Sequence, residues 1–133
     1  MVDNGLITVA SAHGVKDTID RLEAEAKSKG LTVFARIDHA AGAAGAGLAL
    51  RPTELLIFGN ARAGTPLMQS RQTIGVDLPL KALAWEDSGG QVWLCYNDPA
   101  WLAARHGLAA DGGEVTKAMA AALAALTTKA AAP

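Results

Sequence analysis

The chain has 133 residues, of which half are hydrophobic and 19% are charged. This length and composition predict one globular domain with its own core, and they exclude an intrinsically disordered chain. Twelve basic and thirteen acidic residues give a formal net charge of -1. Because nucleic-acid binding draws on a broad cationic surface, we expect no nucleic-acid partner.

The sequence also predicts where the protein resides. The N-terminus has no basic segment followed by an apolar run, and no apolar stretch is long enough to cross a membrane. The lone Cys95 stands in an apolar strand pattern and has no cysteine with which to form an internal disulfide. We therefore expect a cytoplasmic protein with no membrane partner.

The first third of the chain predicts a strand, a helix and a second strand. Leu6–Ala10 is apolar and rich in β-branched residues, and apolar residues recur at helical spacing from Val15 until Gly30. Thr32–Asp38 is predicted to be a strand that alternates regularly along its whole length.

A segment rich in glycine and alanine follows. Asp38 is placed to cap a short helix over Ala40–Ala46, and the small side chains there predict close contact with a neighbouring element. The glycines also suggest a phosphate-binding loop, but their spacing matches neither the P-loop nor the dinucleotide-binding fingerprint. Close helix packing is the interpretation that the spacing favours.

The middle of the chain predicts a strand that is covered on both sides. Glu54–Phe58 is apolar on both faces, whereas a sheet with one solvated face alternates between apolar and polar residues. Thr65 followed by Pro66 then predicts the start of a short helix over Leu67–Gln72.

The next two strands are predicted as a β-hairpin. Leu80–Glu86 and Gln91–Asn97 are joined by Asp-Ser-Gly-Gly, whose glycines adopt the positive φ that a tight turn needs. Asp98 and Pro99 then predict the start of another short helix.

The C-terminal segment predicts a long amphipathic helix over about residues 114–129, and its last residues, from Ala130, are expected to fray. The apolar positions that recur at helical spacing are Val115, Met119, Leu123 and Leu126.

These elements predict a single α+β domain over residues 1–133, with a five-stranded, mainly antiparallel sheet and two long helices on one face. The other face of the sheet is also apolar and needs a cover. A second copy of the chain is the simplest cover, so we expect a homodimer.

Several segments resemble a bacterial and archaeal family called domain of unknown function 302. The resemblance covers roughly residues 5–108 and is carried by GLTVFARIDHAAGAAGAGLALRPTELLIFGN, AGTPLMQSRQTIGVDLPLKALAWED and VWLCYNDPAWLAARHGL. It implies a TATA-binding-protein-like fold of order β-α-β(4)-α, often found as a homodimer, and it implies no established activity. Ala61 stands where the family pattern has proline, so the loop beside Asn60 is expected to differ.

Four polar residues lie at strand ends or on otherwise apolar strands, and the resemblance places each on a characteristic family position: His39, Glu86, Asn97 and Asp98. In a functional interpretation, His39 and Glu86 form an acid/base pair or bind a divalent metal, and Asn97 orients the ligand. In a structural interpretation, Asp98 caps a helix, Asn97 ends a strand, and the other two are hydrogen-bonded core residues. The structural interpretation is the one that we favour.

Other chemical signatures are incomplete. A structural zinc site needs four Cys or His ligands at short spacing, and a catalytic triad needs a reactive nucleophile in a recognisable setting. We therefore expect no cofactor and no metal beyond the weak candidates His39 and Glu86. Arg51 and Arg62 are interpreted as solvated loop charges, with anion binding as the alternative.

The biochemical role is unknown from the sequence, and small-molecule binding by a homodimer is the leading hypothesis. One alternative is an acid/base or metal-dependent enzyme that uses His39 and Glu86, and another is a structural or partner-binding module. The ligand pocket is expected where strand ends meet the short helix that Pro66 begins. Its predicted residues are His39, Met68, Gln69, Glu86, Tyr96, Asn97 and Asp98.

Overall fold

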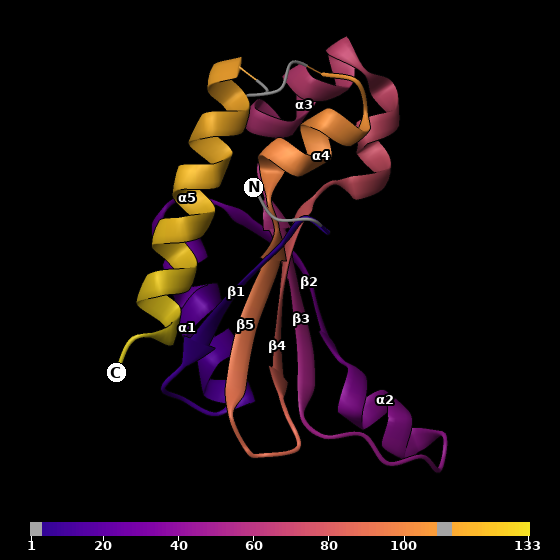
Figure 1. Cartoon of the computed structure of the whole chain (residues 1–133), viewed down its shortest axis with the longest axis vertical. Helices are drawn as coiled ribbons and strands as arrows, with labels where there is room; N and C mark the ends of the chain where they lie inside the picture. Colours follow the sequence, from indigo (N-terminus) through magenta and orange to yellow (C-terminus); the bar gives the residue numbers. More distant parts are fainter. Residues whose placement is uncertain (1–3, 109–112) are drawn as a thin grey trace.

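The computed structural model describes residues 4–108 and 113–133, whose strands form one five-stranded sheet. The strands are β1 (Leu6–Ser11), β2 (Thr32–Asp38), β3 (Thr53–Gly59), β4 (Leu80–Glu86) and β5 (Val92–Asn97). They lie in the order β1-β5-β4-β3-β2, and every neighbouring pair is antiparallel. The first two strands of the chain therefore form the two edges of the sheet (Figure 1).

Two long helices, α1 (Val15–Ser28) and α5 (Gly113–Ala131), cover one face of this sheet (Figure 1). Burying an aliphatic or aromatic side chain contributes about 1.5–3 kcal/mol, so this interface supplies much of the stability of the fold. The arrangement confirms the predicted α+β class and the order β-α-β(4)-α. The fully buried residues between the helices and the sheet include Ile19, Leu22, Leu56, Phe58, Leu94 and Leu123.

Short helices connect the strands. They are α2 (His39–Gly45), α3 (Ala61–Ser70), the 3₁₀ helix η1 (Gln72–Asp77) and α4 (Pro99–Arg105). Two of the predicted caps are confirmed: the side chain of Asp38 accepts a hydrogen bond from the amide of Ala41 at 2.9 Å, and that of Asp98 accepts one from the amide of Ala100 at 3.0 Å. Such caps satisfy amides that have no partner within the helix.

The predicted start of the third helix is wrong. Helix α3 begins at Ala61 rather than at Thr65 and Pro66, and the proline lies inside the helix. The cap is Asn60, whose Oδ1 accepts a hydrogen bond from the amide of Ala63 at 2.8 Å. Proline is compatible with helical φ but removes one amide donor. Pro66 therefore indicated that a helix was present but not where the helix begins.

The prediction that the glycine-rich helix packs closely against a neighbour is also wrong. No residue of α2 is buried, and a Cβ added to Gly42 or Gly45 would meet nothing within 4 Å. The helix projects away from the body of the molecule (Figure 1). The segment after it carries two exposed apolar side chains, Leu48 (68% exposed) and Leu50 (50% exposed).

Strand β2 departs from the predicted regular alternation. Val33 is paired with Phe58 and Ala35 with Ile57, so Phe34 is an extra residue, as in a β-bulge. A bulge changes which residues face each side of a sheet. Val33 therefore faces the helices whereas Ala35 faces away from them, and Phe34 is 55% exposed.

The C-terminus of α5 is docked rather than frayed, in contrast to the prediction. Ala130 and Ala131 are buried. The guanidinium group of Arg21 donates to the carbonyl oxygens of Ala130 (2.9 Å) and Ala132 (3.2 Å), and the imidazole of His13 hydrogen-bonds to the carbonyl of Ala132 at 2.6 Å. A cation at a helix C-terminus also interacts favourably with the helix dipole.

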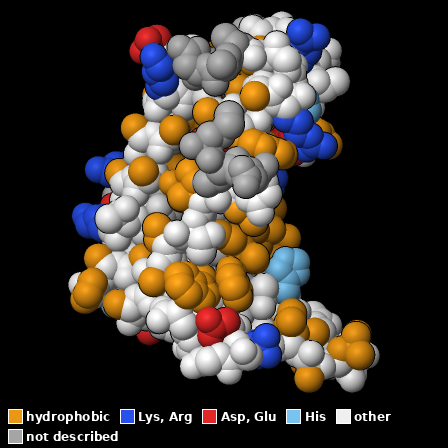
Figure 2. Space-filling view, viewed as in Figure 1, with side chains coloured by type: hydrophobic (Ala, Val, Ile, Leu, Met, Phe, Trp, Pro, Cys, Tyr) orange, Lys and Arg blue, Asp and Glu red, His pale blue; other side chains and the backbone are white. Residues whose placement is uncertain are grey.

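The face of the sheet away from α1 and α5 is mostly apolar across its three central strands, with Lys81 of β4 as its charged residue. Strand register places these side chains opposite one another, because residues paired across an antiparallel ladder share a face. Hydrophobic side chains gather between the short helices at one end of the molecule and α2 at the other (Figure 2). The apolar residues of this open face are Leu55, Ile57, Leu83, Trp85, Trp93 and Cys95, and Lys81 and Thr53 lie on the same face, paired with Ile57 and Trp85.

One arginine connects the edge of the sheet to α1. Arg36, on β2, forms ion pairs with Asp20 (2.7 Å), Glu23 (3.3 Å) and the buried Glu54 on β3 (2.8 Å). Its side chain is only 26% exposed. Loss of the guanidinium group would therefore leave the carboxylate of Glu54 buried without a cation.

We expect Arg36→Gln to lower the free energy of unfolding by about 2 kcal/mol, less than the loss for a fully buried pair because the arginine is partly exposed. Chemical denaturation measures this difference. The double variant Arg36→Leu with Glu54→Leu should recover most of it, since neither buried charge remains. A double variant as unstable as Arg36→Gln would contradict this role of the ion pair.

The difference in the free energy of unfolding between the wild type and Arg36→Gln should depend on pH. Hydrogen bonds from Lys16 and Arg36 lower the pKa of Asp20, and those from Lys27 and Arg36 lower the pKa of Glu23. A carboxyl group with a lowered pKa stabilises the folded state above its unfolded pKa and loses this effect as the pH falls through its folded pKa. The stability gap between the wild type and Arg36→Gln should therefore shrink below about pH 4.

Candidate functional site

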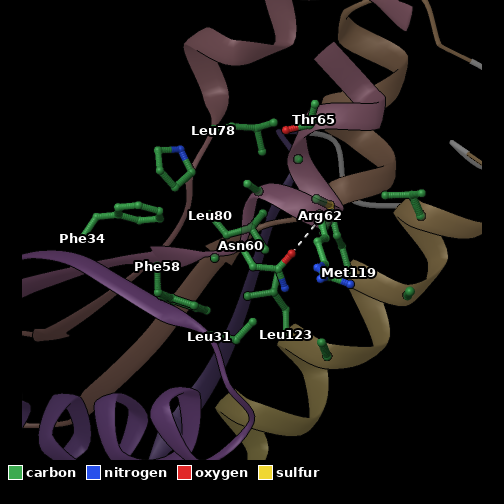
Figure 3. A pocket seen from close by; sticks show the side chains of 18 of the residues that line it. Leu31, Phe34, Phe58, Asn60, Arg62, Thr65, Leu78, Leu80, Met119 and Leu123 are labelled. Carbon is green, nitrogen blue, oxygen red and sulfur yellow. Dashed lines mark hydrogen bonds between the residues drawn. The ribbon is translucent and has the colours of Figure 1, made fainter. Parts of the chain in front are cut away.

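A cavity of about 630 Å³ lies on the helix side of the sheet, between α3, η1 and the N-terminal half of α5 (Figure 3). Its inner wall comes from the sheet, where Phe58 lies next to the last residue of β3 and Leu80 begins β4. Leu31 and Phe34 close the side nearest the edge strand β2. The cavity therefore occupies the end of the sheet at which β2 and β4 begin.

The unequal lengths of the two long helices explain why this space is open. The 19 residues of α5 span about 28 Å, whereas the 14 residues of α1 span about 21 Å. Helix α1 ends at Ser28, so the first turns of α5 face α3 instead of α1. The ten-residue α3 does not fill the room that a longer α1 would occupy.

Small side chains on α5 keep the wall of the cavity open. Ala118 and Ala122 are one turn apart, as are Met119 and Leu123 beside them. An alanine fills little of the space in front of the helix, while the methionine and leucine anchor it on the core. The six cavity-lining residues of this helix are Val115, Ala118, Met119, Ala122, Leu123 and Leu126.

The polar residues of the lining come from the first half of α3. They are Asn60, Arg62 and Thr65, and all three are exposed. Figure 3 shows the dashed hydrogen bond that Asn60 makes as the helix cap, with Arg62 beside the α5 wall. Among the described residues, the side chain of Arg62 has no hydrogen bond and no ion pair. The cavity is thus apolar inside and positively charged at one rim.

The 3₁₀ helix η1 is held in place against α4 from outside the cavity. Asp77 forms an ion pair with Arg105 (2.9 Å) and contacts the imidazole of His106, whose other ring nitrogen lies 3.0 Å from the hydroxyl of Thr73. A hydroxyl, an imidazole and a carboxylate in series resemble a catalytic triad. None of these residues lines the cavity, so their evident effect is to fix η1.

The residues predicted as one site lie at opposite ends of the sheet. His39 begins α2 and Glu86 ends β4, at the hairpin end, while Met68, Asn97 and Asp98 lie at the other end. Strand β3 lies between β2 and β4, so about 10 Å separates the strands that precede His39 and carry Glu86. Among the described residues, neither of these two side chains makes a hydrogen bond or an ion pair. The structure thus does not bring the two members of the predicted acid/base pair together.

The other predicted residues have separate surroundings. Gln69 is exposed on α3, and Asp98 caps α4. Asn97 ends β5, and Tyr96 is buried beneath the helices, where burial raises the pKa of its phenol. Met68 is the one residue of the predicted set that lines the cavity. The cavity beside α3 and α5 therefore differs from the pocket expected from the sequence and shares only Met68 with it.

Cys95 and the metal candidates offer no further chemistry in the described part of the chain. Cys95 is buried, and burial raises the pKa of its thiol, which disfavours the reactive thiolate. Within residues 4–108 and 113–133, no three His, Cys, Asp or Glu side chains gather to hold a metal ion.

Sequence reasoning missed the rim of the cavity because it read Asn60 as part of a loop and Arg62 mainly as a solvated charge. The alternative that Arg62 binds an anion was a usable signal. The alanines at helical spacing in α5 were a second signal, because they alternate with large apolar residues on one face. Neither signal shows by itself that α1 stops short of α3.

A family sequence pattern and a solved structure both resemble this chain. The sequence pattern described as domain of unknown function DUF302 matches residues 7–126. A crystal structure of an uncharacterized conserved DUF302 protein from Bacillus stearothermophilus superposes with a TM-score of 0.83 at 21% identity. The match covers 95% of this chain and 98% of that protein, and it shows a shared fold.

Two proteins from Brucella are closer in sequence. The chain is 59% identical over 119 residues to proteins of Brucella suis and Brucella abortus, each named fluoride-specific ion channel FluC 1. The aligned region covers 90% of this chain but only 47% and 44% of those proteins, so the chain spans a little under half of their length. In the described ranges 4–108 and 113–133, no helix has the length and apolar character needed to cross a bilayer. The match over residues 7–126 shows that this chain belongs to the DUF302 family.

Proposed function

We propose that this protein binds a small, largely apolar molecule in the cavity between α3, α5 and the sheet. The observation that supports this most strongly is the lining itself, whose described residues are apolar except for three at one rim. A volume of about 630 Å³ lies within the range of about 300–1,000 Å³ that is typical of ligand pockets. An apolar interior with a few polar groups at one side is also the usual composition of such sites.

The walls of the cavity are suited to enclosing ligands of varied shape. Met68 and Met119 line it from α3 and α5, and methionine adapts its shape because its side chain is unbranched and polarizable. Gly75 in η1 approaches Met68 so closely that an added Cβ would lie 3.1 Å from its sulfur. The wall on this side is therefore tightly packed, while the side near Ala118 and Ala122 is open.

Filling the cavity should weaken binding. We expect Ala122→Trp to weaken the binding of the neutral fluorescent probe N-phenyl-1-naphthylamine by about tenfold or more, a loss of about 1.4 kcal/mol. The indole would occupy the space of the ligand while its backbone stays on an exposed face of α5. Probe fluorescence in a titration measures the affinity.

Ala124→Trp is the matched control, because Ala124 is exposed on the same helix but does not line the cavity. It should bind the probe as the wild type does, and both variants should unfold at similar temperatures. Equal probe binding by Ala122→Trp and Ala124→Trp would place the site elsewhere and overturn the proposal.

We also propose that the protein is a homodimer that joins two open faces. These faces are mostly apolar, with Lys81 beside Ile57, and sheets that pack face to face lie about 10 Å apart with their side chains interdigitated. The projecting α2 and the exposed Leu48 and Leu50 extend this apolar surface beyond the sheet (Figure 2). A twofold axis would let each copy cover the other with the same residues.

Sedimentation velocity tests the dimer. We expect a dimer of the wild type at micromolar concentration and a shift to monomer in Leu55→Lys, because the variant places a charge at the centre of the open face. Ala121→Lys, on the exposed side of α5, should remain dimeric. A monomeric wild type would overturn both this interface and the alternative in which the dimer itself is the function.

A second candidate function is a role beside fluoride transport, favoured by the 59% identity to the Brucella proteins named fluoride-specific ion channels. On this proposal the chain acts as an accessory region, since none of its described helices is suited to crossing a bilayer. Deleting its gene should lower the fluoride concentration that stops growth, and a plasmid copy should restore it. Unchanged fluoride tolerance in the deletion strain would contradict this candidate.

The cytoplasm is the location that we propose for the chain. The free thiol of Cys95 supports a reducing compartment, because unpaired cysteines persist there.

A further inference from the structure

We propose that the ligand of the cavity carries an anionic head group, which binds at Arg62 and the start of α3. This inference rests on the proposed ligand-binding function and adds the chemical class of the ligand: a single-chain amphiphile with a carboxylate or similar head. It concerns a soluble molecule rather than a membrane lipid, because the cavity admits one small ligand and lies among the elements of a folded domain.

The charge of the lining supports an anion. Among the described residues that line the cavity, Arg62 is the only charged one, and none is acidic. In the described part of the chain, its guanidinium group has neither an ion pair nor a hydrogen bond. An arginine has five N–H donors in a planar arrangement that matches a carboxylate. Here those donors are free to bind a ligand.

The backbone at the same rim adds to this positive potential. Asn60 uses its Oδ1 to cap the amide of Ala63, and its side-chain NH2 has no hydrogen-bond partner among residues 4–108 and 113–133. The first amides of the ten-residue α3 have no acceptor within the helix, and the helix dipole places positive charge at this end. The dipole only reinforces the site, which depends on the cavity and on Arg62.

The nearby acidic groups do not oppose an anion. Asp77 in η1 is engaged by Arg105 and His106 at the end of α4 and does not line the cavity. Glu114, at the start of α5, does not line the cavity. The apolar chain of an amphiphile would extend from the rim toward Met119, Leu123 and Phe58, and its head would remain at the exposed edge of α3 (Figure 3).

Three ligands of equal chain length test the head group: decanoate, decanol and decyltrimethylammonium. Calorimetric titration of the full-length protein should show decanoate binding about tenfold more tightly than decanol, with the cation weakest, because an exposed charge pair and a helix dipole each contribute modestly. Arg62→Gln should bind decanoate about three- to tenfold more weakly than the wild type does and should bind decanol equally well. Arg62→Lys, which retains the charge, should keep most of the preference.

Two further variants separate the site from general charge effects. Arg71→Gln removes an exposed arginine of α3's C-terminal end that does not line the cavity, and it should bind as the wild type does. Asn60→Asp retains a capping residue while adding a negative charge at the rim. This variant should bind decanoate more weakly, and decyltrimethylammonium more tightly, than the wild type does.

The outcomes distinguish this inference from the proposed function. Equal affinities for all three ligands, with no effect of Arg62→Gln, would overturn the anionic head group and leave apolar binding intact. Failure of every decyl compound and of the neutral probe to bind would overturn both. Binding to phosphatidylglycerol vesicles without binding to decanoate would replace the soluble ligand with a membrane lipid and overturn the inference.

Discussion

The packing of two helices of unequal length on one sheet determines most of the structure. Helix α1 crosses beneath the sheet to connect its two edge strands, and α5 returns along it from the opposite end. Where the two helices lie side by side, their apolar faces pack on the sheet and bury core residues that include Ile19, Leu22 and Leu123. Beyond the end of α1, only α3 and η1 remain to cover the sheet, and the cavity is the space that they leave.

This geometry requires α5 to be held at its C-terminal end. Arg21 donates to the carbonyl of Ala130 at the end of the helix, and His13 hydrogen-bonds to the carbonyl of Ala132 just after it. These contacts lie at the end where α1 begins, so they fix α5 on the core. The first turns of α5 are left to form the cavity wall through their small and flexible side chains. Stability and ligand access thus come from different ends of one helix.

The sequence predicted those features that depend on neighbours along the chain. The bounds of β2 and β4 are as predicted, and Asp38 and Asp98 cap the helices expected of them, because strand and capping signals are local. The projection of α2 was not predictable in this way. Small residues permit close packing but do not require it, and here the helix lies against open space.

The candidate site shows the same limit more sharply. His39 and Glu86 are conspicuous polar residues at the ends of apolar strands. The strand order places them at the ends of β2 and β4, however, with β3 between them. Arg62 was noticed as a possible anion contact, yet nothing near it in the sequence reveals that α5 lies across from it. A site made by the mismatch of two helix lengths is a tertiary property, so only the assembled structure discloses it.

The methionines provide the most direct measurement of whether this cavity receives a ligand. The chain has three, and two of them, Met68 and Met119, line the cavity from opposite walls. In NMR spectra of protein labelled with ¹³C at the methionine methyl groups, decanoate should shift both of these signals at a shared saturating concentration. It should leave the indole signals of Trp85 and Trp93, on the open face, unchanged. Shifts of the indoles with unmoved methyl signals would contradict the cavity as the binding site.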